Sequence, residues 1–536
     1  MMIRRVLLAA CVLAFAPVLV LADDDPSTAP AGITPVSTMT VSHLLKLHRI
    51  AVGRLDPNTP DTRTEVWTYV DAGLSGTMTA VYKGGDFRTD ITLGPFHSSH
   101  GQLGAKVWEQ NENGLTRDMS DVHKRDDVNR YALAHPLLKA SAVELLGTID
   151  KPVRSYVVKV APRSGRVEYI YYDASTYLIV RDERAADGQR IVRTFDDFRI
   201  TKGLREPWHI HESNGQPKDD RDWKMQSLAV GDPVDPAKLA VPANRDPVTL
   251  NGDRVTLPAK LSGDRIVVTV QIGAHKVNLL LDSGSSGILL NRDVADATGV
   301  QSFGEKTETT AGTYLSSDAL IPKIDFGVAT MQHVSAETAP YEEWSYGDIP
   351  IAGLMGYDFI AGAVIHVDYV SQTVEAIAPS AFKPPAGAIA LPIRLDDGVP
   401  VIDAVIGKAQ AHHFIVDTGA DRSMIFSAFA QAHPGDVADQ GLGQEMTESL
   451  PFVDKVSGVG GKVQVHPVQV SSLTIGSVHL PDWLFEVSQD APAFETDDYD
   501  GLIGQDVLRN FDVYFDYGHT MLYLAPNERY RQRWGG

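Results

Sequence analysis

Two short stretches decide the fold of this chain: residues 279–285 read Leu-Leu-Leu-Asp-Ser-Gly-Ser, and residues 414–420 read Phe-Ile-Val-Asp-Thr-Gly-Ala. In each, an apolar run ends at an aspartate, Asp282 or Asp417, which is followed by a hydroxyl residue and a glycine. Such a run predicts a buried strand, and the glycine permits a tight turn where the chain leaves the strand. Each aspartate is therefore expected at a buried turn, where its carboxylate is poorly hydrated.

The surroundings of the two stretches repeat as well. Residues 353–358 read Gly-Leu-Met-Gly-Tyr-Asp, and residues 501–506 read Gly-Leu-Ile-Gly-Gln-Asp. An Asp-Tyr pair starts twelve residues after the last glycine of each motif, and an Ile-Gly pair precedes each aspartate. Four matched features in one order indicate a duplicated unit. We predict two lobes, residues 248–383 and 388–536, divided by the Pro/Gly stretch 384–387.

The duplication predicts chemistry, because approximate two-fold symmetry brings the two turns face to face. Two adjacent carboxylates share one proton and titrate as a unit. One can act as general base toward a water while the other protonates or polarises a substrate carbonyl. The hydroxyls of Ser283 and Thr418 are expected to bond the backbone of the opposite turn, where alanine would leave polar groups unsatisfied.

Residues 415–421 (Ile-Val-Asp-Thr-Gly-Ala-Asp) resemble the active-site signature of retropepsin-like aspartic peptidases, and residues 281–286 (Leu-Asp-Ser-Gly-Ser-Ser) are similar to the pepsin-type version. The Gly-Leu-Met/Ile-Gly elements resemble the motif that closes the loop around each active turn in that superfamily. The resemblance covers roughly residues 255–530. It implies catalytic residues Asp282 and Asp417, with dyad support and loop closure from Ser283, Gly284, Ser285, Thr418, Gly419, Ala420, Gly356 and Gly504.

The resemblance also implies a substrate cleft between the lobes and a flap hairpin over it. Residues 311–314 and 458–463 are candidate flap regions, and Tyr314 is the candidate aromatic flap residue. The chain departs from pepsins in lacking disulfides and in its short lobes. It departs from the viral enzymes in carrying both lobes, so homodimerisation is not needed and catalysis by a monomer is expected.

The first half of the chain has a different pattern. A helix is predicted over residues 41–52, then an antiparallel meander with a hairpin turn at Gly84-Gly85, and a proline-rich linker over 232–247. This pattern resembles periplasmic lipoprotein-carrier half-barrels, without a residue motif to support it, and implies a lipid or peptide ligand. The fold class predicted for the whole chain is mainly β: an N-terminal meander or half-barrel with a helix, followed by duplicated acid-protease β-barrel lobes.

The N-terminus indicates export. Arg4 and Arg5 precede an apolar run over residues 6–21, and Val20–Ala22 resembles a signal-peptidase site. We predict a signal peptide over 1–22, an accessory domain over 23–240, and a periplasmic or secreted protein. Cys11 stands in a lipoprotein-like box, but the apolar run continues well beyond it, so lipoprotein anchoring is the less favoured alternative. Cleavage would remove the only cysteine, excluding disulfides and thiol chemistry.

The composition of the chain excludes some classes of binding partner. The formal net charge of −21 argues against nucleic acid, whose phosphates require clustered cations. His209 and His211 share a strand face without an evident third ligand. The acidic stretch 497–500 could bind calcium, but a solvated loop is the favoured interpretation, so no metal and no cofactor is expected. Asp358 and Asp506 are expected to cap helices.

Three functions remain open at this stage. The first is an exported, bacterial-type aspartic endopeptidase acting on a peptide or protein. The second is a non-catalytic periplasmic lipid- or peptide-binding protein on an acid-protease scaffold. The third is a structural envelope protein without a ligand.

Overall fold

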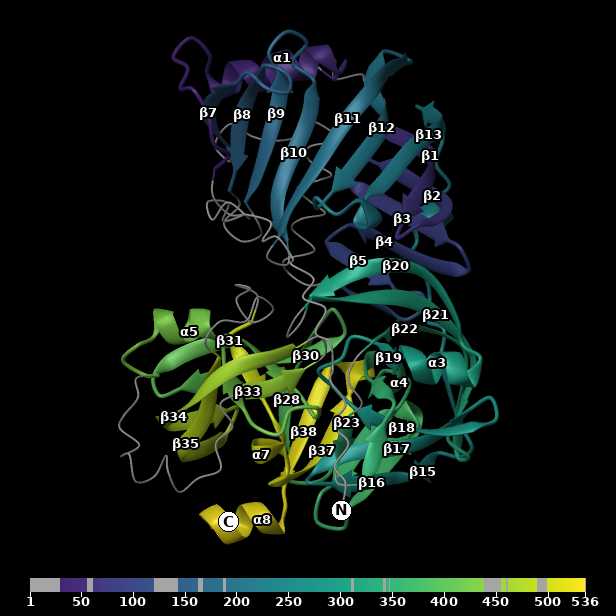
Figure 1. Ribbon diagram of the computed structural model, residues 1–536, viewed down its shortest axis with the longest axis vertical. Coiled ribbons are helices and arrows are strands. Elements are labelled where there is room, and N and C mark those ends of the chain that lie inside the picture. Colours follow the sequence, from purple (N-terminus) through teal and green to yellow (C-terminus); the bar gives the residue numbers. More distant parts are fainter. Residues whose placement is uncertain are drawn as a thin grey trace, which may run out of the picture.

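The computed structural model describes residues 29–54, 61–119, 143–161, 167–186, 189–309, 313–340, 344–346, 348–437, 455–458, 461–488 and 499–535. The predicted signal peptide, Cys11 and residues 497–498 of the acidic stretch 497–500 lie outside these residues. Among the helices of the described ranges, none is both long and apolar enough to cross a membrane. The mainly β fold class is confirmed: Figure 1 shows a broad curved sheet above a body built of smaller sheets.

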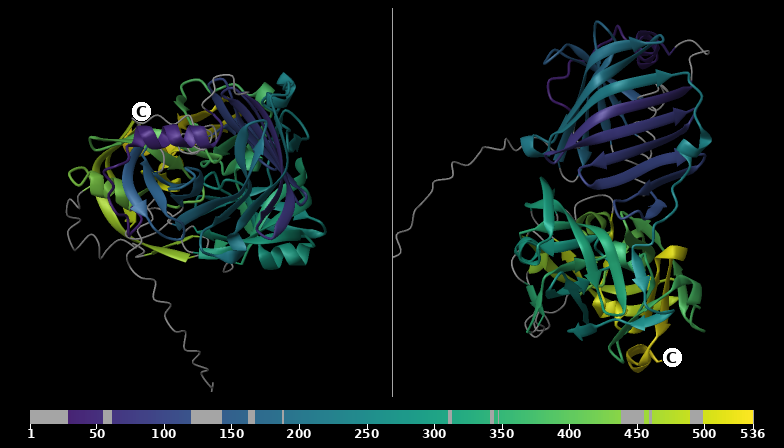
Figure 2. Two further views of the ribbon diagram at one scale, coloured as in Figure 1. Left: turned by 90° about the horizontal axis from the view of Figure 1, so that it is seen from above. Right: turned by 90° about the vertical axis from the view of Figure 1, so that its right-hand side faces the viewer.

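The N-terminal domain is one antiparallel sheet of thirteen strands with a helix on one face. The strands run in the order β6-β5-β4-β3-β2-β1-β13-β12-β11-β10-β9-β8-β7, and the right-hand view of Figure 2 shows the sheet's curvature. The expected helix and the hairpin at Gly84-Gly85 correspond to α1 and to β2–β3. The elements are α1 (Val41–Ala51), β1 (Thr62–Asp71), β2 (Leu74–Lys83), β3 (Asp86–Leu93), β4 (Phe96–Leu103), β5 (Lys106–Gln110), β6 (Thr116–Asp118), β7 (Val143–Ile149), β8 (Ser155–Val160), β9 (Glu168–Asp173), β10 (Ile179–Ala186), β11 (Gln189–Thr201), β12 (Leu204–Ser213) and β13 (Arg221–Val230).

Helix α1 covers the β8–β9 end of this sheet. Its buried Leu44 and Leu45 pack with Val158, Ile170 and Tyr172 from those strands. Thr40 caps the helix by accepting a hydrogen bond from His43 N at 3.2 Å. The helix is thus held by an apolar stripe against one face of the sheet.

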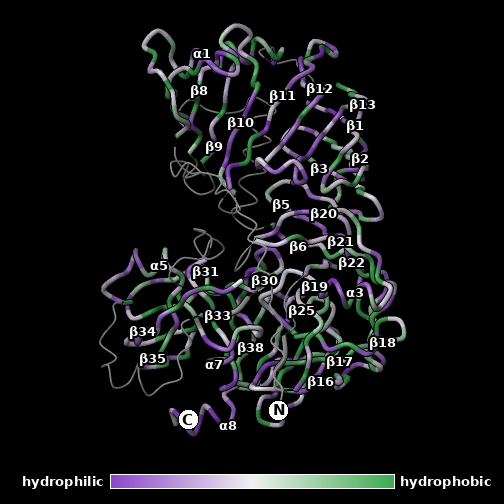
Figure 3. Tube along the Cα trace, viewed as in Figure 1, coloured by the Kyte–Doolittle hydropathy of each residue, from purple (hydrophilic) through white to green (hydrophobic). Residues whose placement is uncertain are grey.

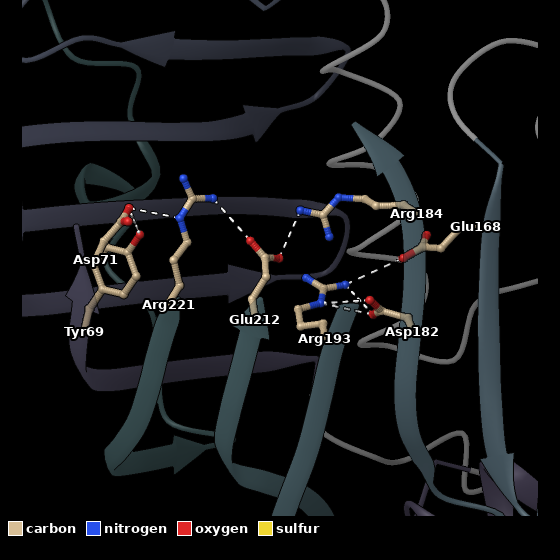
Figure 4. A network of polar contacts seen from close by, with 8 residues as sticks. All are labelled: Tyr69, Asp71, Glu168, Asp182, Arg184, Arg193, Glu212 and Arg221. Carbon is tan, nitrogen blue, oxygen red and sulfur yellow. Dashed lines mark hydrogen bonds and ion pairs between the residues drawn. The ribbon is translucent and has the colours of Figure 1, made fainter. Parts of the chain in front are cut away.

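The same face carries an arginine–carboxylate network, drawn in Figure 4. Cross-strand register aligns Asp182, Arg193, Glu212 and Arg221 across four strands. Arg193 pairs with Asp182 at 2.5 Å, and Glu212 accepts from Arg184 at 3.0 Å and from Arg221 at 3.2 Å. Burial acts to raise the pKa of Glu212, but the surrounding arginines outweigh it and lower the pKa to about 2. The middle of this face is therefore charged and internally neutralised, unlike the apolar lining that an acyl chain prefers.

The proline-rich segment 232–247 is bound to the N-terminal domain along its length. It contains the 3₁₀ turn η3 (Pro236–Leu239). Arg88 donates to Ala240 O at 2.9 Å, Gln110 donates to Ala243 O at 3.1 Å, and Thr116 N donates to Asn244 Oδ1 at 2.6 Å. The segment that connects the N-terminal domain to lobe 1 is consequently held in place by hydrogen bonds to that domain.

Lobe 1 is built on a sheet in the order β14-β22-β19-β25-β18-β17-β21-β20, with β16 paired to β17. Figure 3 shows apolar residues along β18 and β22, in agreement with their buried positions. Its elements are β14 (Val248–Leu250), β15 (Arg254–Thr256), β16 (Ala259–Ser262), β17 (Arg265–Ile272), β18 (His275–Leu281), β19 (Ile288–Asn291), α3 (Arg292–Thr298), β20 (Gln301–Thr309), β21 (Thr313–Asp325), β22 (Ala329–Ala339), β23 (Trp344–Tyr346), β24 (Ile349–Ile351), β25 (Gly353–Met355), α4 (Tyr357–Ile360), β26 (Val364–Asp368) and β27 (Thr373–Ile377).

Lobe 2 repeats this plan in the order β29-β30-β31-β36-β32-β35-β34-β33. Its elements are β28 (Ile389–Pro392), β29 (Arg394–Asp396), β30 (Val399–Ile406), β31 (Ala409–Val416), β32 (Met424–Ile425), α5 (Ser427–Ala432), β33 (Lys455–Gly458), β34 (Gly461–Ile475), β35 (Val478–Ser488), β36 (Gly501–Ile503), α7 (Gln505–Leu508), β37 (Phe511–Asp516), β38 (Met521–Pro526) and α8 (Glu528–Trp534).

A third sheet joins the lobes and locates their symmetry axis. It runs β15-β27-β26-β37-β38-β28, so that β26 of lobe 1 pairs with β37 of lobe 2. His366 and Tyr514 face each other in this pairing, and their rings stack at 4.1 Å. Each lies ten residues after its motif glycine, Gly356 or Gly504, so they are equivalent residues. An approximate two-fold axis therefore passes through this pair.

Within the described residues, the N-terminal domain contacts lobe 1 at two main places. At strand β20, Thr307 N donates to Asp219 Oδ1 at 2.9 Å and Glu305 N donates to Ala72 O at 3.0 Å. The second contact is the turn between β5 and β6, residues 111–115, which reaches the helix α4 region. Both contacts lie on the lobe that carries Asp282, and beside the second one Arg117 of β6 also reaches Asp397 of lobe 2 at 3.8 Å.

Candidate active site

Asp282 and Asp417 lie face to face where the two lobes meet. Each follows a strand, β18 or β31, that runs parallel to the short strand β25 or β36 of the same lobe. A Cβ added at Gly284 would lie 2.7 Å from Asp417 Cγ, and one added at Gly419 would lie 2.6 Å from Asp282 Cγ. Neither glycine has a positive φ. We expected glycine at these positions because of the backbone conformation of a tight turn, and that reason was wrong. Glycine is needed because any side chain there would collide with the carboxyl group of the opposite turn.

The hydroxyls of Ser283 and Thr418 join the two turns reciprocally. Ser283 Oγ donates to Val416 O at 2.6 Å and accepts from Thr418 N at 3.0 Å. Thr418 Oγ1 donates to Leu281 O at 2.7 Å and accepts from Ser283 N at 2.9 Å. Four buried hydrogen bonds therefore fix the distance between the turns, with both hydroxyl residues almost completely buried.

Replacing Thr418 by alanine should destabilise the protein by about 2 kcal/mol, because Leu281 O and Ser283 N would lose their partners in a buried site. Replacement by serine should restore most of the stability, since it retains the hydroxyl. The measurement is urea unfolding of the three proteins. Equal losses for alanine and serine would show that the methyl group, and not the hydroxyl, matters.

The two carboxyl groups have different surroundings. Asp282 Oδ1 accepts from Gly284 N at 2.9 Å, whereas Asp417 Oδ1 accepts from Gly419 N at 2.7 Å and from Ala420 N at 3.2 Å. Burial raises the pKa of both, and the charge of Asp417 raises the pKa of Asp282 further. Because hydrogen bonds from N–H groups favour the ionised form, Asp417 is better placed to hold the negative charge of the pair and Asp282 to hold its shared proton.

This arrangement predicts the pH dependence of any reaction at the site. The dyad must keep one proton, and the raised pKa of Asp282 means that it keeps this proton above the ordinary aspartate pKa of 3.8. Turnover should fall as pH rises through that raised pKa, because both carboxylates are then ionised. A pH–kcat profile checks this, and a profile that keeps rising into the alkaline range would contradict it.

The segments that contain the motif glycines Gly356 and Gly504 pack against the two aspartate turns. Gly356 N donates to Gly287 O at 2.9 Å, and Asp282 N donates to Met355 O at 3.0 Å. In lobe 2, Asp417 N donates to Ile503 O at 2.9 Å. A Cβ at Gly356 would lie 2.1 Å from Ser285 O, and one at Gly504 would lie 2.6 Å from Arg422 C. Glycine is required at both positions by this close backbone approach.

Asp358 and Asp506 do not have the helix-capping role expected from the sequence. The N-cap residues of α4 and α7 are Gly356 and Gly504, and the two aspartates lie inside the first turns. Asp506 Oδ1 accepts from Ser423 N at 2.9 Å and from Ser423 Oγ at 2.8 Å. Asp358 Oδ1 accepts from Asn111 Nδ2 at 2.8 Å. Each side chain therefore fixes a neighbouring loop.

The remaining predicted residues are placed as follows. Ser285 Oγ donates to Gly287 O at 3.1 Å, within its own turn. Tyr314 lies on β21 opposite Glu308 and packs against the apolar cluster that contains Leu280 and Leu354. Residues 310–312 and 459–460, which include parts of both candidate flap tips, lie outside the described residues.

Sequence reasoning missed two groups at the dyad. Arg265, from lobe 1, donates to Gly419 O at 2.6 Å and forms an ion pair with Asp421, so it clamps the turn of the other lobe. Tyr517 is buried beside Tyr357, with ring centroids 6.1 Å apart. Burial and the charges of both aspartates raise its pKa. The repeat of Tyr369 at Tyr517 was visible in the sequence, whereas nothing there singled out Arg265.

The histidines considered for a metal have other partners. His209 contacts Asp196 at 2.9 Å and Asp222 at 2.8 Å. Within the described part of the chain, no group of three His, Cys, Asp or Glu residues is placed to hold a metal ion.

Comparisons with known proteins agree with this geometry. Residues 268–359 and 402–507, which contain both aspartates, match the model of a family described as Aspartyl protease. The match spans less than half of the chain and supports an aspartic-peptidase-like fold for these segments. No curated protein matches the chain.

Solved structures also show similarity. An aspartic proteinase from Irpex lacteus is 16% identical with a TM-score of 0.33, over 52% of this chain and 98% of that chain. A LolA superfamily protein from Nitrosomonas europaea is 11% identical with a TM-score of 0.28, over 38% of this chain and 98% of that chain. A DUF1329 family protein from Desulfovibrio piger is 14% identical with a TM-score of 0.28, over the same shares.

Proposed function

We propose that this protein is an exported aspartic endopeptidase that hydrolyses peptide bonds with a water held between Asp282 and Asp417. The supporting observation is the reciprocal hydrogen bonding of Ser283 and Thr418, which brings two buried carboxyl groups together to share one proton. Such a pair supplies both a base and an acid without a metal.

In the proposed reaction, the carboxylate of Asp417 removes a proton from the water as its oxygen attacks the peptide carbonyl carbon. The proton on Asp282 is transferred to the carbonyl oxygen, giving a neutral tetrahedral diol. Asp417 then returns its proton to the leaving nitrogen, Asp282 recovers a proton from the diol, and the C–N bond breaks. The products are a carboxylic acid and an amine, and the dyad regains its single proton.

The site is complete within one chain, since each lobe contributes one aspartate and one hydroxyl residue. We therefore propose catalysis by a monomer. We also propose a periplasmic or secreted location, because of the signal-like residues 1–22.

The test is incubation of the purified protein with a peptide library between pH 3 and pH 8, followed by mass spectrometry. We expect new termini, with one oxygen from labelled water in each new carboxyl group. Added methanol or amines should not be incorporated, because no acyl-enzyme forms. Binding of library peptides without new termini at any pH would instead favour a non-catalytic binding protein on this scaffold.

A further inference from the structure

The equivalent carboxylates Asp358 and Asp506 obtain their hydrogen-bond donors from different parts of the chain. In lobe 2, Ser423 donates to Asp506 through its N–H and its hydroxyl, and Ser423 Oγ accepts from Gly504 N at 3.0 Å. Ser423 lies six residues after Asp417, in the loop that leaves the catalytic turn. Lobe 2 thus connects its glycine motif to its catalytic turn with its own residues.

Lobe 1 has no hydroxyl at this place. Ile288 lies six residues after Asp282, where Ser423 stands in lobe 2. The buried Asp358 instead accepts a hydrogen bond from Asn111 Nδ2 at 2.8 Å, and Asn111 belongs to the β5–β6 turn of the N-terminal domain. Asn111 Oδ1 accepts from Leu115 N at 3.0 Å, which fixes the orientation of the amide so that its NH₂ group faces the carboxylate.

The β5–β6 turn is packed into lobe 1 around this contact. The side-chain amide of Asn113 accepts from Ser335 N at 2.7 Å through Oδ1 and donates to Ser335 O at 3.0 Å through Nδ2. It thus binds both backbone groups of this residue of strand β22, as a neighbouring strand would. Leu115 is 4% exposed and belongs to the main hydrophobic core of the peptidase lobes. Arg117 lies over the ring of Tyr357 at 5.0 Å. Hydrogen bonds, a core side chain and a cation–π contact therefore pack this turn into lobe 1.

Asp358 directly follows the segment that holds the catalytic turn. Within that segment, Gly356 N donates to Gly287 O at 2.9 Å, and Tyr357 N donates to Ser285 O at 3.0 Å. The carboxylate also lies against the turn, since a Cβ at Gly287 would be 3.2 Å from Asp358 Oδ2. A displacement of Asp358 would therefore be passed to the backbone that orients Asp282.

We propose that Asn111 is a positioning residue for the peptidase site, supplied by the N-terminal domain to replace the serine that lobe 1 lacks. The proposal rests on the peptidase function proposed above. It makes the N-terminal domain a permanent component of the catalytic unit, in contrast to a prosegment that is removed to uncover the cleft.

The test exchanges the hydrogen-bond donor, Asn111, and its acceptor, Asp358, by substitution. Asn111→Asp keeps the size and the Oδ1 acceptor but places a carboxylate against Asp358, and we expect kcat to fall by about tenfold or more with KM changed less than about twofold. Asp358→Asn should also lower kcat. The double variant Asn111→Asp/Asp358→Asn restores a hydrogen bond with the opposite polarity, and should recover kcat to within about threefold of the wild type. Asn251→Asp, the same substitution at a lobe 1 surface loop, is the control.

Hydrogen exchange of residues 279–290 is measured on the wild type, the two single variants, the double variant and the control. We expect faster exchange in both single variants and recovery in the double variant. If the wild type cleaves peptides but the single variants match it in kcat and exchange, the positioning role is wrong and the peptidase function stands. If the wild type cleaves nothing, the peptidase function is wrong, and exchange alone decides whether Asn111 orders the turn. Lost activity without recovery in the double variant would also reject the proposal, because it indicates general damage.

Discussion

Replacing Asp417 by asparagine is expected to lower kcat/KM for peptide cleavage by about 10³- to 10⁴-fold. An asparagine amide has nearly the same shape and can keep the hydrogen bonds from Gly419 N and Ala420 N, but it cannot remove a proton from water. Asp282→Asn should cause a comparable loss, because the dyad then has no acidic proton to transfer to the carbonyl oxygen. The double variant should be little worse than either single variant, since the two residues act as one unit.

The control for this prediction is Asp403→Asn. Asp403 is 63% exposed on lobe 2 and pairs with Arg394 at 3.2 Å, so its replacement makes the same charge change away from the dyad. Activity should remain near that of the wild type. Folding is also checked, because a carboxyl group whose pKa is raised by folding weakens stability as pH rises above its ordinary value. Asp282→Asn should therefore be at least as stable as the wild type at pH 7, and cleavage that survives either dyad substitution would refute the mechanism.

Replacing Glu212 by glutamine should destabilise the N-terminal domain by about 3 kcal/mol. The substitution keeps the side-chain volume but removes the buried carboxylate shared by the largely buried Arg184 and the partly exposed Arg221. Unfolding of this domain can be followed by hydrogen exchange of β12 and β13 in increasing urea. The matched control is Asp232→Asn, which breaks the exposed pair with Lys202 and should cost well under about 1 kcal/mol.

The effect of Glu212 should depend on pH in a definite direction. Its folded pKa of about 2 lies below the ordinary value of 4.5, so its stabilisation is complete above that value and is lost as pH falls toward 2. The difference between wild type and Glu212→Gln should therefore shrink over this interval. A difference that is constant from pH 7 to pH 3 would show that the charge of Glu212 is not the cause.

The sequence predicted the C-terminal half better than the N-terminal half for a physical reason. Internal repetition revealed that Asp282 and Asp417 are equivalent, and equivalence under an approximate two-fold axis brings them together. The hydroxyls of Ser283 and Thr418 could then be expected to bond the backbone of the opposite turn. By contrast, the network of Glu212, Arg193 and Asp182 depends on strand register across the sheet, which local patterns do not specify.

Contacts between segments far apart in the chain could not be predicted from the sequence either. Asn111 and Asp358 are separated by 247 positions, and no local pattern links an asparagine turn to a carboxylate in another domain. The missing hydroxyl at Ile288 was a readable signal, since the equivalent position in the repeat is Ser423. Its meaning required knowledge of which group faces Asp358 in the folded chain.

The central claim, that Asp282 and Asp417 share a proton and act on a peptide carbonyl, is tested most directly by a statine-type peptide, whose hydroxyl mimics the tetrahedral intermediate. Its affinity should be compared by calorimetry with that of the matched peptide lacking the hydroxyl, using the wild type and Asp417→Asn. We predict that the hydroxyl strengthens binding to the wild type by about 100-fold or more and that this gain disappears in the variant. Equal affinity of the wild type for both peptides would contradict the account.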